Sequence, residues 1–212
     1  MRTHLELPIF RQQTGYECGN TSLKSVLWYL GRRRSAKYLR RLCRVRSDGV
    51  DHRRVVDAAR KLGATVFTKQ AGTIADLRWF LRRELPVIVG WWSRDLEAGD
   101  LHFCDGWTLA ERKRHDCGHY SVVSGVSNRT VTLMDPQQEL SRGHWRGVGN
   151  VSMSHRAFLD VWYDTDTDRY VKIDRWLMVV NFDGERFRDR VRGGRDHLPL
   201  DGHSSVRDRA KD

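Results

Sequence analysis

The spacing of apolar residues changes part-way along the chain. Up to about residue 81 they recur every three to four positions, which is the spacing of amphipathic helices. From about residue 86 they occur in short runs bounded by polar or turn-forming residues, which predict strands. Helices followed by mostly antiparallel strands are typical of an α+β fold, here an N-terminal helical half packed on a C-terminal antiparallel sheet.

Start and stop residues bound the expected elements. Gly31 and Gly63 follow two expected helices, where glycine commonly ends a helix. Asn128-Arg129 lies between two expected strands and predicts a tight hairpin. The expected helices cover residues 19–30, 35–42, 51–62, 74–81 and 154–161. The expected strands cover residues 65–68, 86–92, 120–126, 130–134 and 176–182.

The 212 residues suit one domain followed by a tail. We expect a single domain over residues 1–182. Residues 183–212 are rich in Arg, Asp and Gly and poor in apolar residues, which predicts a flexible charged tail. Residues 93–117 are polar and without clear periodicity, and a loop of this length is usually functional or an insertion.

Two observations concern the compartment. The longest strongly apolar run, Val87–Trp92, has six residues, whereas a bilayer-spanning helix needs roughly 20. The first ten residues lack the apolar stretch of a secretory signal. We therefore expect no membrane span and a cytoplasmic protein.

The chain is strongly basic, with a formal net charge of +11. Arginine is dense over residues 32–46, and two helices within 35–62 could place one helix in a DNA major groove. Acidic residues are interspersed almost everywhere, however, so a solvated basic face is the simpler interpretation. We do not expect nucleic acid as a partner, and an acidic partner such as a peptide substrate is the other use of this face.

Cys18 lies where a loop enters the first expected helix. A thiol at a helix N-terminus feels the positive end of the backbone dipoles, which favours the thiolate. A small buried cysteine near a helix start is the simpler interpretation of a lone cysteine. Cys18 is not alone, because a hairpin with His119 at the start of one strand and Asp135 after the next brings these two side by side. Cys, His, Asp is the chain order of papain-like cysteine hydrolases.

The surroundings of these residues strengthen that interpretation. Gln12 lies six residues before Cys18-Gly19, and the helix that follows ends in Tyr-Leu-Gly at residues 29–31. His119 stands in Gly-His-Tyr-Ser-Val-Val, and Asp135-Pro136 follows sixteen residues after it. In order, spacing and hydrophobic pattern, these segments resemble the bacteriocin-processing, double-glycine leader peptidases, which are papain-like cysteine peptidases. The resemblance spans about residues 8–136.

The resemblance implies a role for each residue. Cys18 would attack a carbonyl as thiolate, and His119 would hold the thiolate as an ion pair and then protonate the leaving amine. Asp135 would orient His119. The side chain of Gln12, with the backbone N–H of Cys18, would form the oxyanion hole, with Gln13 as the competing donor. No cofactor is needed for this chemistry.

The chain also departs from the pattern of that family. Glu17 stands where Asp is usual, Asn20 stands where Pro is common, and the segment between Trp92 and Gly118 is longer than usual. No transporter domain is present in the sequence, although many family members carry one. The expected activity is cleavage of peptide amide bonds through a thioester. Deamidation, transpeptidation or a non-catalytic module that binds peptide or nucleic acid remain alternatives.

Residues outside this constellation allow three further hypotheses. His102, Cys104, His115 and Cys117 form a paired His/Cys pattern that could hold zinc, although the spacing is not that of a familiar finger. Cys104 and Cys117 could instead form a disulfide in an oxidising compartment. Gly193-Gly194 in the tail resembles a double-glycine cleavage site, which makes self-processing a third hypothesis. Cys43 is expected in the core.

Overall fold

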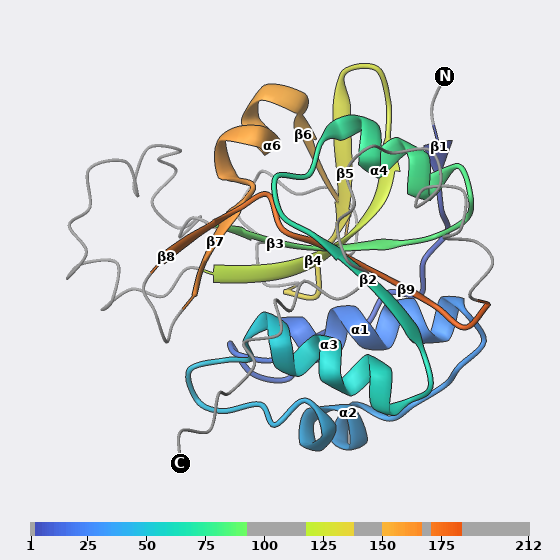
Figure 1. Ribbon diagram of the computed structural model, residues 1–212, viewed down its shortest axis with the longest axis vertical. Helices are drawn as coiled ribbons and strands as arrows, with labels where there is room; N and C mark the ends of the chain where they lie inside the picture. The colour runs from blue at the N-terminus through green and yellow to red at the C-terminus, as the bar shows by residue number, and fades with distance from the viewer. Residues whose placement is uncertain (1–2, 93–117, 138–149, 167–170, 184–212) are drawn as a thin grey trace, which may run out of the picture.

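The computed structural model describes residues 3–92, 118–137, 150–166 and 171–183. One antiparallel sheet of seven strands runs through its centre (Figure 1). Six strands lie side by side in the order β2, β9, β3, β4, β5 and β6, and β1 pairs with β4 beyond Val87, the first residue of β3. The bounds are β1 Thr3–His4, β2 Thr65–Lys69, β3 Val87–Trp92, β4 Gly118–Val126, β5 Thr130–Met134, β6 Asn150–Ser154 and β9 Leu177–Asn181.

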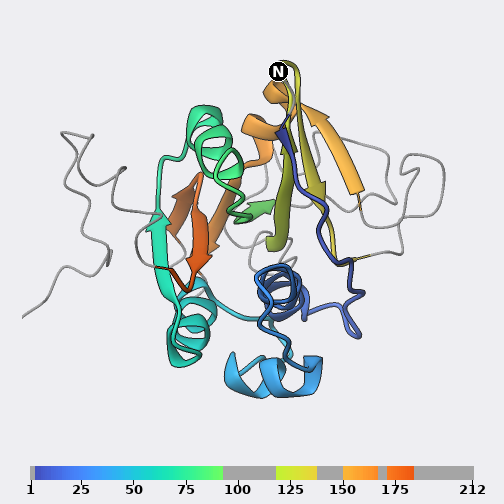
Figure 2. The same cartoon turned by 90° about the vertical axis from the view of Figure 1, so that its right-hand side faces the viewer.

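Helices cover both faces of this sheet. Helices α1 (Cys18–Tyr29), α2 (Ala36–Leu42) and α3 (His52–Lys61) lie on one side, and α4 (Ile74–Leu81) and α6 (His155–Val161) lie on the other (Figures 1 and 2). The α+β expectation is therefore confirmed. The helices begin where local side chains cap them, with Ser35, Asp51, Thr73 and Ser154 each accepting a backbone N–H of the first turn.

The sheet separates two hydrophobic cores. Val87 and Val89 of β3 pack towards α4 and α6, whereas Ile88 packs among residues of α1 and α3. A strand that is buried on both faces needs apolar residues at successive positions, which is why β3 forms a continuous apolar run. Cys43 is fully buried in the second core, as expected.

The hairpin that carries the candidate site is present. The N–H of Ser127 donates to the carbonyl of Thr130 over 2.9 Å and closes the turn between β4 and β5. Strand β6 and the two-stranded sheet of β7 (Tyr163–Asp166) and β8 (Val171–Asp174) were not predicted. Their sequences are short and polar, so they carry little of the apolar signal on which the strand predictions depend.

Within the described part of the chain, no helix combines the length and the apolar composition required to cross a bilayer.

Candidate active site

Cys18 is the first residue of α1, and 6% of its surface is exposed. The preceding residue, Glu17, makes no side-chain cap on this helix, unlike the cap residues of the other described helices. The first N–H groups of a helix have no partner within it. The N-terminus of α1 therefore presents backbone donors and the positive end of its dipole beside the Cys18 thiol.

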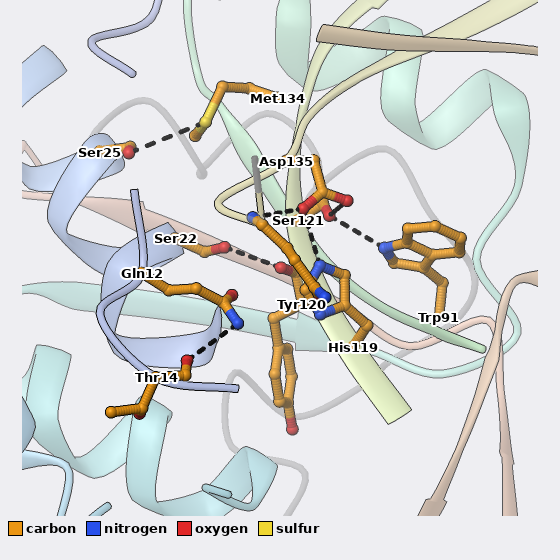
Figure 3. Close-up of polar contacts among 11 residues, drawn as sticks. Gln12, Thr14, Ser22, Ser25, Trp91, His119, Tyr120, Ser121, Met134 and Asp135 are labelled. Atoms are coloured by element: carbon orange, nitrogen blue, oxygen red, sulfur yellow. Dashed lines mark hydrogen bonds and ion pairs between the residues drawn. The ribbon is translucent and has the colours of Figure 1, made fainter. Parts of the chain in front are cut away.

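The hairpin brings His119 and Asp135 together, as the sequence predicted. His119 is the second residue of β4, and Asp135 directly follows β5. Nε2 of His119 lies 2.9 Å from Oδ1 of Asp135, and both side chains are buried (Figure 3). Because Nε2 is engaged by the carboxylate, Nδ1 is the ring nitrogen left for Cys18.

The electrostatics of this cluster favour a protonated imidazole. Burial opposes the charged form of His119, but the charges of Asp135 and Cys18 and hydrogen bonds to both side chains outweigh it and raise the pKa of His119 well above its usual value. An imidazolium between a carboxylate and a sulfur atom is the arrangement required for a thiolate–imidazolium pair.

The Asp135 carboxylate accepts two further hydrogen bonds. The backbone N–H of Gln137 donates to Oδ1 over 2.7 Å, and the hydroxyl of Ser121 donates to Oδ2 over 3.2 Å. Ser121 in turn accepts the indole N–H of Trp91 over 3.0 Å (Figure 3). Ser121 could not be recognised from the sequence, because a serine in an apolar strand gives no signal of its partners.

The two glutamines before Cys18 differ in their surroundings. Gln12 is buried, and its Nε2 donates to the carbonyl of Thr14 over 3.0 Å. Gln13 is exposed, and its backbone N–H donates to the Glu17 carboxylate over 3.2 Å. The structure therefore places Gln12, and not Gln13, with its side chain in the interior near the start of α1.

Glu17 and Gly19, which flank Cys18, hold the start of α1 in place. The buried carboxylate of Glu17 pairs with Nε of Arg40 from α2 at 3.2 Å. A Cβ atom on Gly19 would lie 2.5 Å from Cγ1 of Val50, which is closer than carbon atoms can approach. A larger residue at this position would force Val50 or the start of α1 to move.

A second polar cluster lies beside the site, and no motif in the sequence indicates it. The hydroxyl of Tyr120, which follows His119 on β4, lies 2.8 Å from Nδ1 of His52 at the start of α3. Nε2 of His52 lies 3.6 Å from a carboxylate oxygen of Asp164 on β7. These contacts join the helical layer, the central sheet and the small sheet next to the catalytic candidates.

The predicted zinc ligands His102, Cys104, His115 and Cys117, and with them the Cys104–Cys117 disulfide, lie outside the described residues, as does Gly193-Gly194. Cys43 does not have the properties of a nucleophile. Burial raises the pKa of its thiol to about 12, so the thiol stays protonated, and the thiolate is the nucleophilic form.

Comparison with family models gives one match. The model of the Peptidase_C39 like family matches residues 4–169, which is most of the chain. The chain belongs to this family. Membership in the C39-like family supports a cysteine peptidase-type function and confirms the resemblance drawn from the sequence. No curated protein matches the chain.

Solved structures confirm the fold. The peptidase domain of Streptococcus ComA, a bi-functional ABC transporter involved in quorum sensing, is 21% identical, with a TM-score of 0.57 over 85% of this chain and 100% of that one. A putative C39-like peptidase from Bacillus anthracis is 15% identical, with a TM-score of 0.57 over 85% and 98%. A double-glycine motif protease from an AMS/PCAT transporter, solved with its leader peptide, is 19% identical, with a TM-score of 0.54 over 84% and 92%. This C39-like chain therefore has the papain-like fold.

Proposed function

We propose that this C39-like chain is an active cysteine peptidase in which Cys18 is the nucleophile, His119 the acid–base and Asp135 the residue that orients His119. The observation that carries the proposal is the buried His119 imidazole, which interacts with Asp135 through Nε2 at 2.9 Å and also with Cys18. A structural histidine does not need a thiol at a helix N-terminus on one side and a carboxylate on the other.

Acylation follows from this arrangement. The Cys18 thiolate attacks the carbonyl carbon of a peptide bond, a carbon–sulfur bond forms, and the carbonyl oxygen takes the electron pair of its π bond. As the intermediate collapses, the carbon–nitrogen bond breaks and the leaving nitrogen takes the Nδ1 proton of His119. The products are an amine, a thioester on Cys18 and a neutral His119.

Deacylation reverses the proton transfer. Nδ1 of His119 takes a proton from water, the oxygen attacks the thioester, and the carbon–sulfur bond breaks. The carboxylic acid leaves, and the thiolate–imidazolium pair is restored. If an amine replaces water, the same steps give transpeptidation, and if the first leaving group is ammonia, they give deamidation.

The developing oxyanion is stabilised by backbone and side-chain donors. The N–H of Cys18 at the uncapped start of α1 is one donor, and the amide of Gln12 is the other. Gln12 is buried with its amide nitrogen held by the carbonyl of Thr14, so its position is fixed before substrate arrives.

The substrate class is a peptide or protein, which is supported by the leader peptide bound to the structurally similar AMS/PCAT protease.

A basic hollow of about 390 Å³ suggests where an acidic part of a partner would bind. It is formed by Lys24, Trp28, Arg33, Arg34, Ser35 and Ala36. In the described part of the chain, no carboxylate pairs with Lys24, Arg33 or Arg34. Burial lowers the pKa of Lys24, which lies 3.8 Å above the Phe10 ring, and a bound carboxylate would relieve this cost.

The experiment incubates the protein with a mixed library of synthetic peptides and reads the products by mass spectrometry. We expect new peptide termini with the wild-type protein and none with Cys18→Ala, while Cys43→Ala keeps the activity. Joined peptides, or amides converted to acids without cleavage, would assign the same site to transpeptidation or deamidation. Products that are equal for wild type and Cys18→Ala would refute the proposal.

A further inference from the structure

A line of three buried side chains leads to the far oxygen of the Asp135 carboxylate. Trp91 on β3, Ser121 on β4 and Asp135 after β5 come from three adjacent strands. At most 3% of the surface of each is exposed. The indole nitrogen of Trp91 lies 3.0 Å from the Ser121 oxygen, which lies 3.2 Å from Oδ2 of Asp135.

The chemistry of these groups determines which one donates and which one accepts in each hydrogen bond. An indole N–H can only donate, so the Ser121 oxygen is the acceptor of the first bond. The hydroxyl proton of Ser121 is then directed at Asp135, because a carboxylate can only accept. Without Trp91, a serine hydroxyl could rotate towards another acceptor, so the indole selects the rotamer that serves the carboxylate.

The sheet register places these groups next to His119. Trp91 is the cross-strand partner of His119, and the two rings meet edge to face at a centroid distance of 5.7 Å. Ser121 lies two residues after His119, so both side chains leave β4 on the same face. Both oxygens of the Asp135 carboxylate therefore have hydrogen-bond partners. Oδ2 accepts from Ser121, and Oδ1 interacts with His119 and accepts from the Gln137 N–H.

We propose that Ser121, aligned by Trp91, is a positioning residue that holds the Asp135 carboxylate in the orientation in which its other oxygen faces His119. This inference rests on the proposed function only for its catalytic consequence, because the effect on His119 exists whether or not the chain cleaves a peptide. Neither Ser121 nor Trp91 touches the reacting atoms in this scheme.

The test is the titration of the His119 imidazole by nitrogen NMR in the full chain. In Ser121→Ala the carboxylate loses its hydrogen bond at Oδ2 and is held only at Oδ1, by the Gln137 N–H and by His119 itself. The carboxylate can then turn partly away from Nε2, so the pKa of His119 should fall towards its ordinary value, by about half a pH unit to one unit. The matched control is Ser124→Ala, which removes an equally buried hydroxyl of β4 that donates to the Thr132 carbonyl instead. This control should leave the His119 titration unchanged.

Trp91→Phe provides a second variant that keeps an aromatic ring beside His119 and removes the N–H together with part of the indole. It should lower the pKa of His119 by a smaller amount than Ser121→Ala. The inference is overturned if Ser121→Ala titrates like Ser124→Ala, or, should Ser121→Ala not fold, if Trp91→Phe titrates like wild type. A wild-type protein that shows no thiol reactivity at Cys18 would refute the proposed function. It would not affect the conclusion drawn from the His119 titration about Ser121.

Discussion

The backbone N–H of Gln12 donates to the carbonyl oxygen of Pro136 over 2.9 Å. This bond joins the loop before Cys18 to the residue that follows Asp135, so the segments that carry the proposed oxyanion donor and the proposed orienting carboxylate are directly connected. The two segments are more than a hundred residues apart in sequence. Neither loop alone would fix the distance between the groups it carries.

Replacement of Gln12 should therefore impair the chemistry without disturbing this connection, because the bond to Pro136 uses only the backbone. We predict that Gln12→Ala lowers the rate of peptide cleavage by about 10²–10³-fold, as the loss of one oxyanion donor does elsewhere. Alkylation of Cys18 should stay fast, since no oxyanion forms there. Gln13→Ala, at the exposed neighbour, is the control, and an equal loss in both variants would contradict the assignment.

The raised pKa of His119 predicts how stability depends on pH. A histidine whose pKa is higher in the folded state binds more protons there, so its stabilising contribution is complete below about pH 6.5 and is lost as the pH rises through the folded-state pKa. Urea unfolding of the wild type should show this fall above pH 6.5. Asp135→Asn removes the largest favourable cause of the shift and should flatten it, and identical slopes would contradict the described electrostatics.

The surroundings of Asn20 predict that replacing it with an apolar residue stabilises the fold. It is fully buried in the first turn of α1, and within the described part of the chain neither its amide oxygen nor its nitrogen has a hydrogen-bond partner. An unpaired buried polar group costs about 1–3 kcal/mol. Asn20→Leu, which keeps the number and branching of the side-chain heavy atoms, should raise the free energy of unfolding by about 1 kcal/mol in urea denaturation. A loss of stability would show that the amide has a partner in solution.

The basic hollow predicts a salt-dependent affinity for acidic peptide. Lys24→Gln should weaken binding of a short oligoglutamate peptide about two- to fivefold at low salt, as expected for one partly exposed ion pair. The control is Arg82→Gln, an exposed charge at the end of α4 on the other side of the sheet. Equal effects of the two substitutions, measured by calorimetry, would mean that only net charge matters.

How much of this could be predicted from the sequence depends on the range of the interactions. Local patterns predicted α1, the β4–β5 hairpin and, through it, the contact of His119 with Asp135. The support of that contact could not be predicted, because Trp91 and Ser121 meet only through the pairing of β3 with β4. The same holds for His52 of α3 and Asp164 of β7, which lie more than a hundred residues apart in sequence and meet only in the folded chain. Strands β6 to β8 carry too little apolar signal to be recognised without their sheet partners.

The most direct test of the account is the reactivity of Cys18 near pH 6. A limiting thiol alkylator is followed by intact-mass spectrometry on the wild type, Cys18→Ala, His119→Ala and Asp135→Asn. We predict rapid single labelling of the wild type that is absent in Cys18→Ala, slower in His119→Ala and intermediate in Asp135→Asn. If Cys18 reacts no faster in the wild type than in His119→Ala, the thiolate–imidazolium pair does not exist and the proposed mechanism is wrong.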